Sequence, residues 1–228
     1  MSIFWVNGKP TSKAEDWKWS LQEPEKQWKP GYSAWALAHS WEDAQGFPPE
    51  IDDLLRPHFT NATLTKGWVE YQVRMPGSGK ASHNDLFAQA KSREGALCVA
   101  VEGKVSETLG PTIARWHTGS VNRERRLSTI LEHIGLPRAI PDTIRYQLLH
   151  RLASPAIAAS QTFNAQHALM IIHSFSELDE SFADFAALLA LYGLDDVQAG
   201  TLYYLKSVGD LKLYTGWARG DKRFLLGN

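Results

Sequence analysis

Apolar residues form an uninterrupted run over residues 96–101, and residues 168–175 are apolar except for His173 and Ser174. Runs of this length, bounded by polar residues, are typical of strands buried on both faces of an α/β sheet. Residues 62–73 differ, because apolar side chains alternate with polar ones from Val69 to Val73. An alternation with a period of two predicts a strand with one buried face. The pattern therefore predicts a sheet with a well-buried centre.

A further stretch, residues 86–90, is also typical of a strand and is followed by the polar residues 91–95. This connection is short and contains Gly95, so it predicts a hairpin loop. If residues 86–90 and 96–101 pair antiparallel about it, Asp85 lies opposite the far end of its partner strand. That end holds residues 102–104.

Helical patterns account for most of the remaining chain. We expect helices over residues 33–43, directly after Pro48-Pro49, and from Pro111 to Trp116. Another helix is expected to end near Gly135, and one more to run from Phe182 to Tyr192. A longer helix is expected from about Pro141 to Gln166, with a kink or break at Pro155. A polar link with Arg123, Arg125 and Arg126 precedes the helix that ends near Gly135, and residues 201–217 are expected to form a hairpin turning at Gly209-Asp210. The predicted fold class is α/β, with a mixed central sheet and helices on both faces.

The first thirty residues carry four tryptophans among Lys, Glu and Pro. We expect residues 1–30 to be an irregular segment that packs on the core through these indoles, although stacking on nucleic-acid bases is an alternative use. Residues 31–228 are expected to form a single α/β domain.

Composition excludes several classes of protein. With 228 residues and 43% hydrophobic content the chain can bury a full core. The single cysteine, Cys98, lies in a predicted core strand, which excludes a disulfide framework and suits a reducing compartment. No signal peptide and no membrane span are expected, so the predicted location is the cytoplasm. The net charge of −1 means that any site for a polyanion must be a local basic patch.

The strongest chemical signal follows the first buried run. In a strand, side chains at i and i+2 share a face, so Glu102 and Lys104 point the same way and Gly103 points opposite. Charged side chains next to a buried run carry an unfavourable desolvation free energy unless they form ion pairs or have a functional role. The hairpin brings Asp85 to the same place. Two carboxylates and an amine at one spot can hold a divalent cation through oxygen. An ordinary ion pair of Glu102 with Lys104 is the simpler alternative.

This arrangement resembles the PD-(D/E)XK nuclease superfamily, the fold of many restriction endonucleases and repair nucleases. Asp85 matches the first acidic position, Glu102 the second and Lys104 the lysine, while Asn84 stands where the motif nominally has proline. The strings at residues 101–107 and 145–151 also resemble an uncharacterised bacterial family of nuclease-like domains. The resemblance covers roughly residues 60 to 175. It implies a restriction-endonuclease-like core of order α-β-β-β-α-β, here with an extra C-terminal helix and hairpin.

The resemblance also implies a function, the Mg²⁺- or Mn²⁺-dependent hydrolysis of phosphodiester bonds in nucleic acid, with DNA favoured over RNA. Asp85, Glu102 and the carbonyl of Gly103 would hold the metal, and Lys104 would orient or help deprotonate the attacking water. A homodimer is left open, as are the choice between endo- and exonuclease action and the sequence preference.

Four residues are candidates for substrate binding. Gln147, His150 and Arg151 lie off the apolar face of the predicted helix that follows the motif strands, where several superfamily members place groups that touch the scissile phosphate. A solvated helix face explains them equally well. Lys80 ends the string Gly77-Ser-Gly-Lys, which lacks the spacing of a phosphate-binding P-loop and is expected to be a hairpin tip.

Other polar residues leave alternatives open. The superfamily often supplies one more acidic residue from its first helix, and Glu42, Asp43 and Glu50 all qualify. His173 ends a buried strand, where a hydrogen-bonded core histidine is favoured over a catalytic one. Glu107 follows the motif closely and is expected at its rim. The histidines and Cys98 show no zinc-binding spacing.

Two other functions use the same residues. The near-neutral charge favours a non-catalytic binding or structural module that retains the nuclease-like fold as a scaffold. An effector that acts on RNA or on a nucleotide would need the same catalytic groups with a different substrate.

Overall fold

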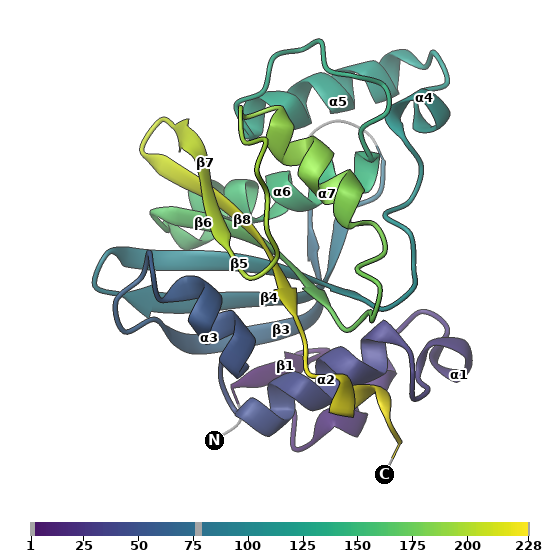
Figure 1. Ribbon diagram of the computed structural model, residues 1–228, viewed down its shortest axis with the longest axis vertical. Coiled ribbons are helices and arrows are strands. Elements are labelled where there is room, and N and C mark those ends of the chain that lie inside the picture. Colours follow the sequence, from purple (N-terminus) through teal and green to yellow (C-terminus); the bar gives the residue numbers. More distant parts are fainter. Residues whose placement is uncertain (1–2, 76–78, 228) are drawn as a thin grey trace.

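The computed structural model describes residues 3–75 and 79–227. Within these residues, strands form one mixed eight-stranded sheet in the order β2-β1-β3-β4-β5-β6-β8-β7, with helices on both faces (Figure 1). The predicted mixed α/β class is confirmed.

The strands are β1 Phe4–Val6, β2 Lys9–Pro10, β3 Thr63–Val73, β4 Ser82–Ser92, β5 Gly95–Lys104, β6 His167–Ser174, β7 Leu202–Val208 and β8 Leu211–Arg219. The α-helices are α1 Pro24–Gln27, α2 Ser33–Ala44, α3 Pro49–Leu55, α4 Ile113–Trp116, α5 Val121–His133, α6 Tyr146–Ala158 and α7 Phe182–Ala190. Two 3₁₀ helices, η1 Ala14–Ser20 and η3 Lys222–Leu225, and a π-helical turn, η2 Ala159–Phe163, complete the elements.

Strands β3, β4 and β5 form an antiparallel meander, and β6 then pairs parallel with β5. A parallel neighbour needs a crossover connection, which α4, α5 and α6 supply between β5 and β6. Strand β8 continues the parallel pairing on the other side of β6, and β7 closes that edge as its antiparallel partner. The helices of the crossover therefore lie over the strands that carry the candidate motif.

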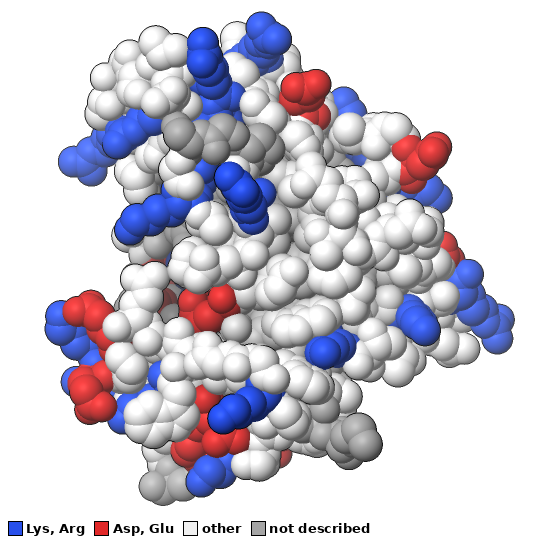
Figure 2. Space-filling view, turned by 180° about the vertical axis from the view of Figure 1, so that it is seen from behind, with Lys and Arg blue, Asp and Glu red and all other residues white. Residues whose placement is uncertain are grey.

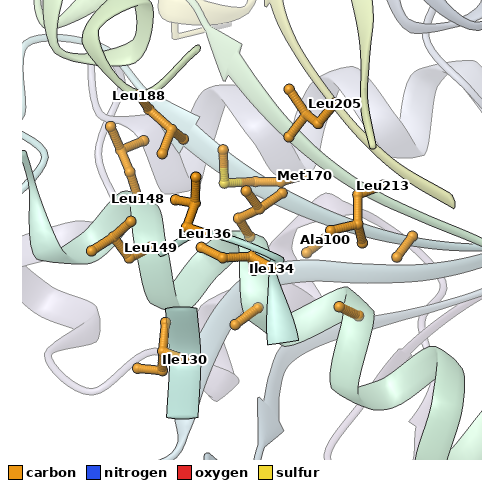
Figure 3. Packing of buried hydrophobic residues seen from close by; sticks show 14 of the residues in the cluster. Ala100, Ile130, Ile134, Leu136, Leu148, Leu149, Met170, Leu188, Leu205 and Leu213 are labelled. Atoms are coloured by element: carbon orange, nitrogen blue, oxygen red, sulfur yellow. The ribbon is translucent and has the colours of Figure 1, made fainter. Parts of the chain in front are cut away.

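Two hydrophobic cores lie on opposite faces of the sheet. Cys98 and Ala100 face the core under α5, α6 and α7, whereas Val99 and Val101 face the core under α2 and α3. Figure 3 shows the first core, where side chains from β5, β6 and β8 meet leucines and isoleucines of the covering helices. Every residue of β6 is buried, as expected for a strand covered on both sides.

Most predicted elements are confirmed in place. The sequence pattern correctly predicts the positions of helices α2, α3 and α7 and of strands β3, β5 and β6. It also predicts the terminal hairpin with its turn at Gly209-Asp210. The hairpin of β4 and β5 is tighter than expected, because Ser92 pairs with Gly95 and only two residues form the turn. Strand β4 also begins earlier than expected, at Ser82, so Asp85 lies inside the strand.

The prediction that residues 1–30 are irregular is wrong. Strand β1 pairs parallel with β3, and β2 pairs antiparallel with β1 about Asn7-Gly8. Both turn residues have positive φ, 49° and 79°, which is the geometry that an Asn-Gly hairpin turn favours. Packing through the indoles holds only in part, because Trp17 is 2% exposed and Trp19 is 69% exposed. Residues 4–10 form an edge of the sheet, and short helices, η1 and α1, follow them.

Two helical predictions also need correction. Arg123, Arg125 and Arg126 lie within α5 and not in a link before it. Helix α6 begins at Tyr146 and is not split at Pro155. Residues 151–159 are all buried, so their packing against β5 and β6 offsets the hydrogen bond that proline cannot make. Among the described residues, no helix is long and apolar enough to cross a bilayer.

The contact of β1 with β3 depends on a glycine and gives a stability prediction. A β-carbon at Gly67 would lie 2.7 Å from Cδ1 of Phe4, whose ring is fully buried. We expect Gly67→Ala to destabilise the protein by about 1–3 kcal/mol through overpacking. Urea unfolding measures the change. Gly46→Ala is the control, because the nearest atom to its β-carbon is at 3.7 Å, and an equal loss in both variants would contradict the explanation.

Candidate functional site

The candidate site lies where strands β4 and β5 separate. Their antiparallel pairing ends at Leu86 and Val101, so Asp85 and Glu102 are the next residues opposite each other, as the hairpin count predicted. Asp85 Oδ2 accepts a hydrogen bond from the backbone N–H of Gly103 at 2.8 Å. The side chain of Asp85 thus satisfies a donor of β5 beyond the end of the ladder and is held at that point.

Glu102 is the centre of a buried ionic network. It is 4% exposed, and both of its carboxylate oxygens have partners. Oε1 accepts from Lys104 Nζ at 3.0 Å and from Gln147 Nε2 at 2.6 Å, while Oε2 accepts from Arg151 Nε at 2.5 Å. A buried carboxylate requires such partners, because desolvation of an unpaired charge costs several kcal/mol.

Helix α6 brings the cationic half of the network to the sheet. Its apolar face, which includes Leu148 and Leu152, is buried, and this fixes the helix over β5 and β6. Gln147 and Arg151 are four residues apart and therefore leave the helix on one side, toward Glu102. The interpretation of these two residues as a solvated face is excluded, since Arg151 is 9% exposed and both contact Glu102.

The network continues from Arg151 to His150. Arg151 Nη1 donates to Ser82 Oγ at 3.0 Å, and the same oxygen lies 3.0 Å from His150 Nδ1. His150 therefore reaches Glu102 only indirectly. Lys80, the fourth predicted substrate-binding residue, lines a cavity together with His150. Gly77 and Ser78 of its string lie outside the described residues.

Charges within the network set the direction of each pKa shift. Burial alone raises the pKa of Glu102, but Arg151 and Lys104 outweigh it and hold the pKa below its usual value. Burial lowers the pKa of Lys104, yet Glu102 and Asp85 outweigh it and raise the pKa. Asp85 lacks such close compensation. Burial and the charge of Glu102 raise its pKa to about 7.

Glu70 is a residue of this site that the sequence did not reveal. It lies within β3 with φ at 51°, in the left-handed region that a glutamate rarely occupies. Trp68 and Tyr71 pack on the α6 side of the sheet while Val69 packs on the α2 side. The predicted regular alternation from Val69 to Val73 is therefore wrong, because the backbone at Glu70 shifts its phase by one residue.

The carboxyl groups of Glu70 and Asp85 share a small cavity. The cavity has a volume of about 80 Å³ and is also lined by Trp17, Gln27 and Trp28. Burial, followed by the charge of Asp85, raises the pKa of Glu70 to about 8. The Glu70 carboxyl group makes no hydrogen bond to any described residue. A strained backbone and two carboxyl groups with raised pKa values at one place are typical of functional sites.

The upstream acidic residues that we considered lie elsewhere. Glu42 accepts hydrogen bonds from Thr11 and Trp17, and Asp43 pairs with Arg223. Glu50 lies 2.8 Å from His173 Nε2. None of the three contacts Asp85 or Glu102 in the described structure.

Two further polar predictions have a clear structural explanation. His173 is fully buried, with Nδ1 accepting from Trp41 Nε1 at 3.1 Å, so it is the hydrogen-bonded core histidine that we favoured. Glu107 accepts from the hydroxyl of Ser33 at 2.6 Å, at the first residue of α2. A carboxylate at a helix N-terminus is stabilised by the helix dipole.

Surface charge is unevenly distributed around the site. Figure 2 shows Lys and Arg gathered at the end of the molecule where α4 and α5 lie, with acidic side chains below them. Arg126 is 7% exposed and donates to Tyr146 Oη and to the carbonyl of Lys80, so it builds the fold as well as the patch. Arg125 is exposed on the same helix.

The site is thus a carboxylate network at the fork of two strands in a mixed α/β protein, with a basic surface beside it. The chain belongs to the family described as a domain of unknown function (DUF6946), which matches residues 10–222. No curated protein and no solved structure matches the chain.

The raised pKa of Glu70 predicts a pH-dependent stability. Below about pH 4 the Glu70 carboxyl group is protonated in both the folded and the unfolded states. Above about pH 8 it is charged in both states, and this charge is unfavourable only in the folded state, where the group is buried. Stability is therefore lost as pH rises through this range. We expect Glu70→Gln to raise the free energy of unfolding by about 1–3 kcal/mol at pH 9 and to change it little at pH 4.

Urea unfolding at the two pH values measures this difference. Glu132→Gln, at an exposed position of α5, is the matched control and should leave the pH profile unchanged. A Glu70→Gln variant that is equally stabilised, or equally destabilised, at both pH values would show that the charge of Glu70 is not the cause.

Proposed function

We propose that this protein is a Mg²⁺-dependent nuclease that hydrolyses phosphodiester bonds, with DNA as the favoured substrate. The observation that carries the proposal is the position of Asp85 opposite Glu102 at the fork of β4 and β5, with Lys104 Nζ 3.0 Å from the Glu102 carboxylate. This is the spatial arrangement of acidic, acidic and lysine residues that the PD-(D/E)XK resemblance implies.

The order of elements supports a restriction-endonuclease-like core. A helical pair, α2 and α3, precedes the β3-β4-β5 meander, and α6 then leads into β6, parallel to β5. The terminal β7-β8 hairpin and α7 are additions to that order. Because one fold can host many functions, the order of elements supports the restriction-endonuclease-like fold and not nuclease activity.

The donor groups suit magnesium. Asp85 and Glu102 offer carboxylate oxygens, which favour a hard cation over zinc. Among the described residues, no three His, Cys, Asp or Glu side chains are grouped closely enough to hold a metal by themselves. Mg²⁺ does not require such a cage, because it keeps several waters and uses one or two carboxylates with phosphate oxygens. Asp85 and Glu102 would hold the ion, with the carbonyl of Gly103 as a further ligand.

The Glu70 side chain adds a further carboxyl group beside Asp85. Together, Glu70, Asp85 and Glu102 carry one negative charge more than Lys104 and Arg151 neutralise when all five are ionised. That excess is consistent with a cation site and with the raised pKa values of Glu70 and Asp85. A bound Mg²⁺ would lower the pKa of a coordinated water and neutralise charge on the phosphate.

Side chains around Glu102 would orient the attacking water and hold the metal-binding carboxylate. Lys104, which is ion-paired with Glu102, would orient the attacking water and stabilise the negative charge that develops on the phosphate oxygens. Arg151 holds Glu102 from the helix side, and Gln147 fixes the second carboxylate oxygen. These contacts keep the carboxylate in one orientation and limit its freedom before substrate binds.

A non-catalytic scaffold is the second candidate, and one observation favours it. Both oxygens of Glu102 are already engaged by Lys104, Gln147 and Arg151, so a metal would have to share or displace one of these contacts. A buried network of this kind is also found where charges only specify a fold.

Metal binding separates the two candidates. Calorimetric titration with Mn²⁺ should show a site in the wild type that is lost in Asp85→Asn, in which the amide oxygen still accepts from Gly103. Asp210→Asn, in the exposed β7-β8 turn, is the control. Absence of a metal site in the wild type, together with no cleavage of a panel of DNA and RNA substrates, would leave only the scaffold.

Lys104→Ala separates catalysis from metal binding. We expect turnover to fall by roughly 10²–10⁴-fold, the usual effect of losing one positioned proton-transfer group, while Mn²⁺ affinity stays close to that of the wild type. The fold should persist because Arg151 and Gln147 still neutralise and orient Glu102. Single-turnover kinetics with Lys91→Ala as the control measures the loss. Unchanged turnover would remove Lys104 from the mechanism.

A further inference from the structure

A second cavity lies beside the carboxylate network, on the side of the sheet covered by α5 and α6. Its volume is about 370 Å³. The side chains that decide its chemistry are those of Lys80, Trp116, Arg123, Arg126, Tyr146 and His150. Two of them, Lys80 and His150, are among the predicted substrate-binding residues, so the cavity gives those predictions a common location.

The lining is cationic. It contains Lys80, Arg123 and Arg126 and no carboxylate. Neither Lys80 nor Arg123 forms an ion pair with any described residue, and Arg123 donates instead to the carbonyl of Trp116. Arg126 links the walls, since it donates to Tyr146 Oη at 2.7 Å and to the Lys80 carbonyl at 2.6 Å. Lys80 and Arg123 at one concavity whose described lining holds no carboxylate favour an anionic ligand.

The aromatic rings of the cavity further restrict the class of ligand that it can bind. Trp116 and Tyr146 stack on each other with centroids 3.7 Å apart and an interplanar angle of 9°. The guanidinium of Arg123 lies over the Trp116 ring at 5.5 Å. The ring faces of Trp116 are thus engaged within the protein, which leaves the cations as the groups available to a ligand. A phosphate is favoured over a stacked base.

His150 contributes a neutral donor. Ser82 Oγ accepts from Arg151 and lies 3.0 Å from Nδ1 of His150. In the tautomer in which Ser82 donates to Nδ1, the ring proton resides on Nε2. Burial, followed by the charge of Arg151, lowers the pKa of His150 to about 3, which keeps the ring neutral at physiological pH. A neutral N–H donor can bind a phosphate oxygen without the need for a proton from solvent.

We propose that this cavity binds a phosphate group of the nucleic acid that flanks the phosphate cleaved at Asp85 and Glu102. A hydrogen-bonded series from Glu102 through Arg151 and Ser82 to His150 connects the two places. As a flanking subsite the cavity rests on the proposed nuclease function, whereas its affinity for a phosphate group stands independently. The group is either an internal phosphodiester or a terminal phosphate monoester.

Binding without cleavage tests the cavity. Fluorescence anisotropy in EDTA, with a short single-stranded DNA that bears either a 5′-phosphate or a 5′-hydroxyl, compares the wild type with K80A/R123A. We expect the double variant to bind roughly tenfold more weakly and to lose about one phosphate contact from the salt dependence, a change of about 0.7 in the log-log slope. If the wild type binds the 5′-phosphorylated strand more tightly than the 5′-hydroxyl strand and K80A/R123A does not, the ligand is a terminal phosphate monoester. If K80A/R123A loses the same affinity for both strands, the ligand is an internal phosphodiester.

The matched control is K91A/R93A, which removes the same charge from exposed positions beside the β4-β5 turn. Equal weakening in the control and in K80A/R123A would overturn the proposal, as would undiminished binding in K80A/R123A. Lys80→Ala alone, at an exposed position, repeats the test if the double variant does not fold. If the wild type binds through this cavity but cleaves nothing with Mg²⁺, the nuclease function fails and the phosphate site stands. If it cleaves DNA while K80A/R123A leaves KM unchanged, the phosphate site fails and the nuclease function stands.

Discussion

The burial of the Glu102 carboxylate is the constraint on which the rest of the site depends. A charge that is 4% exposed at the end of a central strand must be neutralised within the protein. Lys104 comes from the same strand, but Arg151 and Gln147 have to be carried there by α6. The helix can occupy that place because its opposite side fills the core over β5 and β6. The ionic network and the hydrophobic core therefore fix the same helix in the same position.

The fork between β4 and β5 sets the position of Asp85 in this site. Pairing stops after Leu86 and Val101, and the freed N–H of Gly103 is taken by Asp85. Strand β3 changes phase at the same level, through the left-handed backbone of Glu70. Backbone strain of about 1–3 kcal/mol persists only where the surrounding structure enforces it. Here it brings a second carboxyl group into the cavity that Asp85 lines, although the charge of each carboxylate disfavours ionisation of the other.

Acidic and basic groups are separated on either side of this network. The cavity of Glu70 and Asp85 lies toward the N-terminal segment and α2, whereas the cationic cavity lies toward α5 and α6. A chain with a net charge of −1 can therefore present a local positive surface next to a local negative one. The proposed functions use this separation, with a cation on one side and a phosphate on the other.

The sequence by itself determined the strands β3, β5 and β6, the helices α2, α3 and α7, and the meeting of Asp85 with Glu102. These follow from local periodicity and from a short hairpin, in which register is set by counting residues. Only the tertiary structure decided that Glu70 joins the site, that Arg151 neutralises Glu102 and that residues 4–10 extend the sheet. The phase shift at Glu70 leaves no trace in an alternation of Val69, Tyr71 and Val73, and the Arg151 contact spans 49 residues. Such contacts depend on how helices and strands pack together, which no local pattern encodes.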